Sequence, residues 1–273
     1  MGQDLIHDRS AGIERLLEIM RRLRDPKTGC PWDIEQTYAT IAPYTIEEAY
    51  EVADAVARQS WSELEGELGD LLLQSVYFAQ MGAEDGHFDF QSVVTAISDK
   101  MVDRHPHIFG AESRDKSAEQ QTRDWEAIKA AERAKTAQSG TLDGIALNLP
   151  GLTRAVKLQK RAARVGFDWP DTISVIDKIV EEAQELVEAK DQADHDHMVE
   201  EFGDLLFVVA NLARHLKIDP EEALRQTNAK FTRRFEAVEA KLSDMGKTPS
   251  ESSLEEMDAL WDVVKTEEKA AKS

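Results

Sequence analysis

Residues 201–213 read EFGDLLFVVANLA, and residues 67–79 read ELGDLLLQSVYFA. The two segments are 134 residues apart and agree at six of thirteen positions. Their large apolar side chains point in every direction around a helix, so we expect two helices that are buried nearly all round. One aspartate stands inside each apolar run, at Asp70 and at Asp204. Because an ionised carboxylate removed from water needs a partner, these positions predict a bound cation or an ion pair.

A second acidic motif precedes each segment. The pattern EExxE occupies residues 47–51 and recurs at residues 181–185 with the same offset of 134. Positions i, i+3 and i+4 are neighbours on a helix, so three carboxylates share one face in each copy. A lone EExxE in so acidic a chain is typical of a solvated surface. Here, however, EExxE and ExxD recur with the same offset, and a KxxxR pattern follows them at residues 100–104 and 230–234. The sequence therefore indicates an internal repeat.

The composition excludes several classes of protein. Acidic residues number 53 and basic residues 33 among 273, giving a formal net charge of −20. This balance argues against a nucleic-acid partner and against an anionic membrane surface. Cys30 is the single cysteine, so an internal disulfide is excluded, as expected for a protein of the reducing cytoplasm. Residues 1–19 carry charges throughout and predict neither a signal peptide nor a membrane helix.

The periodicity predicts an all-α fold in two domains. We find no sustained alternation of apolar and polar residues of the kind that strands require. Residues 135–151, KTAQSGTLDGIALNLPG, combine Gly, Ser, Asn and Pro and indicate a linker. We therefore predict an N-terminal domain over residues 1–139 and a C-terminal domain over residues 140–273. Asp219-Pro220 predicts the start of a helix, with Asp as N-cap and Pro at the first helical position.

The repeated carboxylates predict metal sites. Two i, i+3 pairs offer four oxygen ligands, the donors that Mg²⁺ and Mn²⁺ prefer. The alternative is that the same acids only form ion pairs with Lys or Arg. The predicted metal ligands are Glu182, Glu185, Glu201 and Asp204 in the second copy and Glu48, Glu51, Glu67 and Asp70 in the first.

The motifs resemble those of a known family. EExxE, a gap of fifteen residues and ExxD, all present twice, are similar to the motif of the MazG family of all-α nucleoside triphosphate pyrophosphohydrolases. The likeness extends to DPKTGCPWDIEQT at residues 25–37, KMVDRHPHIFG at 100–110, KLQKRAARVGFDW at 157–169 and NAKFTRRF at 228–235. Almost the whole chain resembles the tandem-domain bacterial members of this family.

The resemblance implies an activity and an assembly. It implies two tandem domains of four-helix type that dimerise through helix bundles, hence a homodimer whose subunits both shape the sites. It implies hydrolysis of a nucleoside triphosphate to the monophosphate and pyrophosphate, with Mg²⁺ held by the second-copy acids. Lys178, Lys230 and Arg234 would contact the triphosphate, and Trp261 would pack on the base. Cationic side chains neutralise the charge of phosphate groups, and an indole offers a stacking surface for a base. The alternative for each residue is a structural role, as a surface ion pair for the cations and as a core side chain for the tryptophan.

The expected mechanism is in-line attack of an activated water on the α-phosphorus, with pyrophosphate leaving. Glu181, which adjoins Glu182, is the candidate base. The two copies differ, because Tyr44 stands at the position of Lys178 and we find no tryptophan placed in the first copy like Trp261. We therefore expect the second copy to be the principal catalyst.

Other interpretations remain open. His105 and His107 suit a metal site, but an HxH in a loop without a nearby cysteine favours a structural role. A ferritin-like di-iron protein would carry Glu-x-x-His pairs, which the repeated helices lack. A helical regulatory scaffold that binds nucleotide without turnover uses the same residues and is the main alternative.

Overall fold

The computed structural model describes residues 4–111, 113, 115–135 and 140–271, and all regular structure assigned there is helical. The all-α prediction is therefore confirmed for the described residues. The chain divides into two compact units, residues 1–129 (unit 1) and 130–273 (unit 2). The boundary predicted at 139/140 adjoins residues 136–139, which lie outside the described residues, so it stays a prediction. Within the described part, no helix is long and apolar enough to cross a bilayer.

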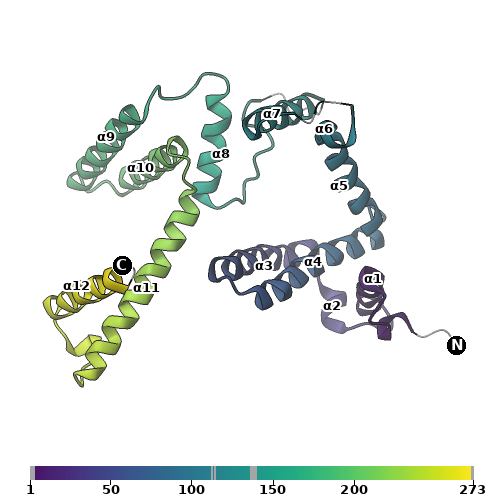
Figure 1. The fold of residues 1–273 in the computed structure, drawn as a ribbon, viewed down its shortest axis with the longest axis horizontal. Helices are drawn as coiled ribbons and strands as arrows, with labels where there is room; N and C mark the ends of the chain where they lie inside the picture. The colour runs from purple at the N-terminus through teal and green to yellow at the C-terminus, as the bar shows by residue number, and fades with distance from the viewer. Residues whose placement is uncertain (1–3, 112, 114, 136–139, 272–273) are drawn as a thin grey trace. The chain divides into compact units, whose positions relative to one another are not determined.

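Unit 1 is built around a helical hairpin (Figure 1). The first helix of the hairpin begins after Thr37, whose side chain accepts a hydrogen bond from the Thr40 backbone at 3.3 Å. It ends at Gln59, whose φ of 56° turns the chain sharply into the next helix. The elements of unit 1 are η1 Leu5–His7, α1 Gly12–Leu23, α2 Pro31–Glu35, α3 Tyr38–Arg58, α4 Trp61–Glu84, α5 Phe90–Arg104 and α6 Pro106–Phe109. Helix α7, Ala118–Lys135, begins in unit 1 and ends within unit 2.

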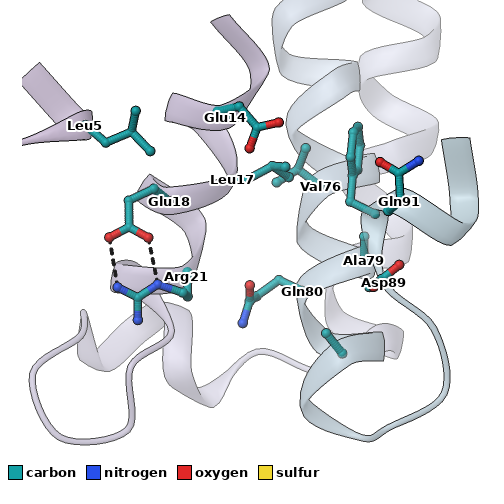
Figure 2. A pocket seen from close by; sticks show the side chains of 12 residues that line it. Leu5, Glu14, Leu17, Glu18, Arg21, Val76, Ala79, Gln80, Asp89 and Gln91 are labelled. Atoms are coloured by element: carbon teal, nitrogen blue, oxygen red, sulfur yellow. Dashed lines mark hydrogen bonds and ion pairs between the residues drawn. The ribbon is translucent and has the colours of Figure 1, made fainter. Parts of the chain in front are cut away.

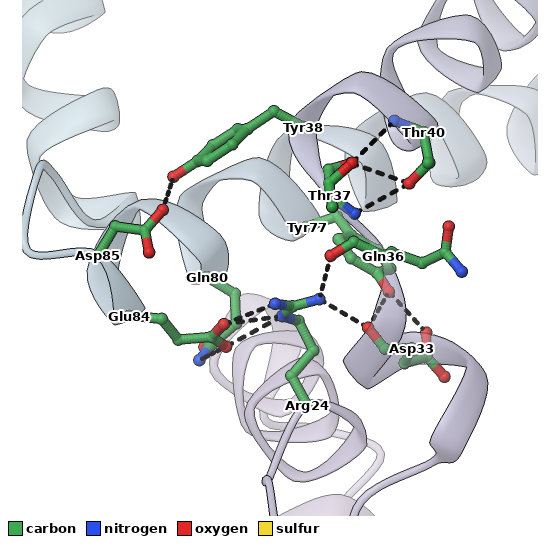
Figure 3. A network of polar contacts seen from close by, with 10 residues as sticks. All are labelled: Arg24, Asp33, Gln36, Thr37, Tyr38, Thr40, Tyr77, Gln80, Glu84 and Asp85. Carbon is green, nitrogen blue, oxygen red and sulfur yellow. Dashed lines mark hydrogen bonds and ion pairs between the residues drawn. The ribbon is translucent and has the colours of Figure 1, made fainter.

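A polar network ties the start of α3 to the end of α4 (Figure 3). Arg24, at the end of α1, pairs with Glu84 at 2.7 Å and donates to the Asp33 carbonyl at 2.6 Å. The Tyr77 hydroxyl donates to the same carbonyl at 2.9 Å. Tyr77 also belongs to the apolar core of the unit, where Met20 is almost fully buried. The short helix α2 before α3 is thus fixed by the half-buried Arg24 and the buried Tyr77.

A pocket of about 340 Å³ lies between α1, α4 and the start of α5 (Figure 2). Leu17 and Val76 form part of its apolar wall, and Glu18 pairs with Arg21 at 2.7 Å on its rim. The acids predicted to bind metal do not line it. This pocket is therefore separate from the candidate site described below.

Unit 2 repeats the hairpin and adds a second one. The pair α9–α10 is the counterpart of α3–α4, and α11 packs against α12 (Figure 1). Asp219 caps α11 by accepting from the Glu222 backbone at 3.1 Å, with Pro220 at the first helical position, as predicted. A small core of Val238, Leu242 and Val264 joins α11 to α12. The elements of unit 2 are α8 Gly151–Ala163, α9 Thr172–Asp191, α10 His195–His215, α11 Pro220–Asp244, η2 Pro249–Glu251 and α12 Leu254–Ala271.

The prediction that residues 67–79 and 201–213 are buried nearly all round is wrong for the single chain. On α10, Phe202 is 53% exposed and Leu206 is 42% exposed, and Asp204 faces solvent. On α4, Leu68 is 50% exposed, and Asp70 also faces solvent. Helix α10 packs against α9 and α8, and α4 packs against α3, α1 and α5, yet each leaves apolar side chains exposed within the described part of its own unit. Hydropathy indicates that a face prefers burial, but not that the same chain covers it.

Candidate active site

Three carboxylates of unit 2 meet between α9 and α10. Glu182 on α9 and Glu201 and Asp204 on α10 each place an oxygen within 4.8 Å of the other two. Glu182 and Glu201 are 4% and 9% exposed. Glu201 and Asp204 lie one turn apart on a single helix, so the antiparallel packing of α9 brings Glu182 against both. Three of the four predicted ligands therefore converge.

The fourth predicted ligand, Glu185, lies one turn beyond Glu182 and is half-buried. Desolvation raises the pKa of Glu201, and repulsion from Glu185 adds to this effect. Glu185 is thus an electrostatic neighbour of the cluster, although it is outside the trio whose oxygens converge. Glu181, the predicted base, is 57% exposed at its side chain and pairs with Lys178.

Basic side chains partner the two buried acids. Lys178 places Nζ 2.7 Å from both Glu181 and Glu182, and these two hydrogen bonds raise the pKa of Lys178. His197 Nε2 lies 2.9 Å from Glu201 Oε1, a contact that opposes the rise in the pKa of Glu201. Sequence reasoning missed His197, although its place four residues before Glu201 puts both on one helix face. A cation and an imidazole therefore lie beside the proposed ligands.

The acids of unit 1 converge in the same way. Glu48 on α3 and Glu67 and Asp70 on α4 place oxygens within 4.8 Å of one another. Desolvation first, then repulsion from Asp70 and Glu51, raises the pKa of Glu48. Desolvation and then repulsion from Glu51 likewise raises the pKa of Glu67. The fourth predicted ligand, Glu51, therefore again lies beside the trio.

The basic partners of unit 2 are not repeated in unit 1. Tyr44 stands where unit 2 has Lys178, and Glu63 stands where it has His197. Glu63 pairs with Arg58 at the end of α3. The trio of unit 1 therefore lacks the two neighbouring basic groups that accompany the trio of unit 2.

The donor sets fit a hard divalent cation. Each trio offers only carboxylate oxygens, and it draws them from two helices with spacings that permit simultaneous contact with one ion. Burial first, and then repulsion from neighbouring carboxylates, raises the pKa of Glu48 and of Glu201, as expected for acids held close together. Neither trio includes a histidine, so the di-iron alternative gains no support among the described residues.

Lys178, one of the four residues predicted to bind the nucleotide, lies on α9 beside the acids, whereas Lys230, Arg234 and Trp261 lie on the other hairpin of unit 2. Arg234 on α11 pairs with Glu268 on α12 at 2.8 Å and lies 5.7 Å from the ring centroid of Trp261. The Phe231 ring lies 5.4 Å from Trp261, and both line a groove of about 230 Å³. Lys230, one turn before Arg234, is exposed. The structure thus places Arg234 over Trp261, whose ring lines this aromatic groove.

Among the described residues of unit 2, no ion pair or ring contact joins the acidic trio to the Arg234–Trp261 pair. The partners of the acids lie on α9 and α10, whereas Arg234 contacts residues of α12. Helix α11 meets α8 near its start, where Glu221 accepts from the Leu152 backbone at 3.2 Å, and then leads away from α9 and α10 (Figure 1). One chain therefore carries both halves of the predicted site on separate hairpins.

Unit 1 also contains an arginine–tryptophan contact, although no tryptophan stands at the sequence position that corresponds to Trp261. Trp125 on α7 lies beneath Arg104, with a distance of 5.2 Å from the guanidinium carbon to the ring centroid. This contact reproduces that between Arg234 and Trp261. A constant sequence offset missed it because α5 ends at Arg104 and a loop precedes α7, whereas α11 continues past Arg234. Each copy has an arginine on one helix in contact with a tryptophan on another helix. A constant offset in sequence cannot identify a contact of this kind.

The two histidines of unit 1 belong to this second aromatic group. His105 lies 5.2 Å from Trp125, and its Nδ1 is 2.7 Å from the Met101 carbonyl. His107 Nδ1 is 3.2 Å from Gln121 Nε2. Neither histidine joins a group of convergent ligands among the described residues, which agrees with the packing interpretation.

Comparison with known proteins agrees with this geometry. The model of the MazG nucleotide pyrophosphohydrolase domain matches residues 36–109 and 171–239, which contain the two acidic trios. The nucleoside triphosphate pyrophosphohydrolase of Escherichia coli K12 is 52% identical over 94% of this chain and 98% of its own length. The nucleoside triphosphate pyrophosphohydrolase/pyrophosphatase MazG of Thermotoga maritima is 42% identical over the same shares, 94% and 98%. With its family motif present twice and its acids gathered on paired helices, this chain belongs to the MazG family.

Proposed function

We propose that this protein hydrolyses nucleoside triphosphates to nucleoside monophosphates and pyrophosphate, with unit 2 as the principal catalyst. The convergence of Glu182, Glu201 and Asp204 between two helices carries the proposal. The names of the E. coli and T. maritima relatives support the same activity. We place the reaction in the cytoplasm, where the nucleotide pool lies.

The acidic trio is the proposed Mg²⁺ site, with Glu185 as the fourth ligand and Mn²⁺ as a substitute ion. When bound, the ion supplies charge neutralisation and lowers the pKa of a coordinated water. Lys178 holds Glu182 in place until the triphosphate enters, and it then donates its hydrogen bonds to phosphate oxygens. His197 holds the Glu201 carboxylate in one orientation through its 2.9 Å contact. Glu181 is the proposed base, because it adjoins the cluster and reaches solvent.

Lys230 and Arg234 bind the triphosphate, and Trp261 stacks on the base. The pairing of Arg234 with Glu268 fixes the guanidinium over the indole, so the phosphate contact and the stacking surface are held together. A guanidinium so held donates to phosphate in a fixed geometry and stabilises the departing pyrophosphate. These roles require the hairpin of α11 and α12 to face an acidic trio.

A homodimer meets that requirement. The uncovered apolar face of α10 includes Phe202, Leu206 and Phe207, which are 38 to 53% exposed in the single chain. A second copy covers such a face and brings its own Arg234 and Trp261 to the acids of the first. Each site then combines residues of both subunits.

Mixed dimers test whether the sites are shared. Asp204→Asn removes an acid, and Arg234→Ala removes a phosphate contact, so each variant alone loses turnover. If each site combines two subunits, the mixed dimer contains one intact site, and random exchange of subunits restores about a quarter of wild-type activity. Sites contained within one chain would leave the mixture inactive. Sedimentation analysis at the assay concentration reports the oligomeric state independently.

Product analysis tests the reaction itself. With Mg²⁺ and a nucleoside triphosphate, the proposal expects equimolar monophosphate and pyrophosphate, whereas diphosphate and phosphate would indicate a different hydrolase. Asp204→Asn should abolish turnover at unchanged helicity, while Asp191→Asn, on an exposed carboxylate at the end of α9, serves as the matched control. Nucleotide binding without any product would favour the regulatory scaffold instead.

A further inference from the structure

The aromatic groove between α11 and α12 is apolar except for one carboxylate. Its walls are Phe231, Phe235 and Val238 on α11 and Leu254, Met257 and Trp261 on α12. The remaining lining residue that the structure describes is Asp258, which stands one turn before Trp261 and therefore on the same face of α12. A flat base that stacks on Trp261 thus meets a single charged group in this groove.

Asp258 differs from other acids of the same helix. Glu256 pairs with Lys247 at 2.6 Å, and Asp262 pairs with Lys265 at 2.9 Å. The side chain of Asp258 has neither a hydrogen bond nor an ion pair within the part of the chain that the structure describes. An ionised carboxylate accepts hydrogen bonds through two oxygens and donates none. Both oxygens of Asp258 are therefore open to the N–H groups of a ligand in the groove.

Two adjacent acceptors distinguish the four common bases. Guanine presents its N1–H and a 2-amino N–H side by side, one for each carboxylate oxygen, and a bidentate pair of this kind is strong because the acceptor is charged. Adenine and cytosine place a ring nitrogen with a lone pair beside their amino group, and uracil places its single N–H between two carbonyl oxygens. A carboxylate repels those lone pairs, so guanine alone matches both oxygens.

We propose that Asp258 selects guanine nucleotides, so that GTP and dGTP are the preferred substrates of unit 2. Its carboxylate accepts hydrogen bonds from N1–H and the 2-amino group of a guanine stacked on Trp261, while Arg234 holds the phosphates. This assignment rests on the proposed function, because it requires the base to enter the groove beside Trp261. Asp258 is exposed, and water can replace the missing partner of another base, so the preference amounts to about tenfold.

Steady-state rates of pyrophosphate release from GTP, ITP, ATP, CTP and UTP test the preference in the full-length chain. The parent protein for these assays carries Asp70→Asn, which removes an acid of unit 1, so that the measured turnover reports unit 2. The kcat/KM for GTP should exceed that for ATP about tenfold. ITP keeps the N1–H of guanine but lacks its 2-amino group, so its kcat/KM should fall between the two.

Asp258→Asn tests the residue itself. An amide offers one donor and one acceptor, which complement the ring nitrogen and the amino group of adenine. The variant should lower the GTP/ATP ratio of kcat/KM toward one, in part through a several-fold rise for ATP, and misfolding cannot produce such a rise. Asp262→Asn removes a carboxylate one turn farther along α12 that does not line the groove, and it should keep the ratio of the parent.

The same assays separate this proposal from the proposed function. Pyrophosphate release with equal kcat/KM for GTP and ATP, or with a preference for another base, would overturn the role of Asp258 and leave the proposed function standing. A preference for GTP that Asp258→Asn does not change would overturn that role as well. No pyrophosphate from any of the five triphosphates would overturn both.

Discussion

Replacing Lys178 by methionine should affect metal and nucleotide in opposite directions. Lys178 Nζ lies 2.7 Å from Glu182 and from Glu181, so in the metal-free protein it already balances a carboxylate of the proposed Mg²⁺ site. A divalent cation must displace or approach that ammonium. Methionine keeps an unbranched side chain, one atom shorter than that of lysine, but removes the competing charge, and Mg²⁺ alone should therefore bind more tightly.

The size of the effect follows from Coulomb's law. Two unit charges 4 Å apart interact by about 1 kcal/mol in water, so a divalent ion and an ammonium repel by about 2 kcal/mol. The Lys178 side chain is 30% exposed and can turn toward solvent, so we take half of this value, about 1 kcal/mol or roughly fivefold in affinity.

Calorimetric titration of the nucleotide-free protein with MgCl₂ measures this change. Electron paramagnetic resonance with Mn²⁺ counts the bound ions. Lys190→Met, on a lysine of the same helix whose side chain is 74% exposed, should leave affinity unchanged. In steady-state assays the Lys178 variant should show a raised KM for the triphosphate, because a phosphate contact is lost. Mg²⁺ affinity that is unchanged or weaker in Lys178→Met would refute competition between the ammonium and the ion.

Three further predictions concern the acids and the hairpin that carries Trp261. Asp70→Asn should reduce total pyrophosphate release less than Asp204→Asn does; a larger loss in the Asp70 variant would make unit 1 the principal catalyst. Because the pKa of Glu201 is raised, mainly by burial, its carboxyl is protonated as the pH falls through that raised value, so Mg²⁺ affinity should fall there in a pH series of titrations. The opposite trend, affinity rising on acidification, would contradict the role of Glu201 as a ligand. Leu242→Ala empties a fully buried position between α11 and α12 and should lower the free energy of unfolding by about 3 kcal/mol in urea melts; a loss below 1 kcal/mol would show that this core is not tightly packed.

The sequence alone predicted the helical class, the repeat and the acids that gather at each hairpin. The repeat was detectable because EExxE and ExxD lie on uninterrupted helices, where a fixed number of residues corresponds to a fixed direction and height. That regularity relates Glu48 to Glu182 and Asp70 to Asp204. It does not extend across a loop, so a fixed offset could not identify the contact of Arg104 with Trp125.

Pairings across turns and between helices were decided by the tertiary structure. The contact of His197 with Glu201, the exposure of Phe202 and the stacking of Arg104 on Trp125 depend on how helices pack, and several arrangements satisfy the same hydropathy pattern. Local periodicity determines which face of a helix is apolar because side chains project at constant angles. What covers that face depends on contacts between residues far apart in the chain, and in this protein much of it is left for another surface to cover.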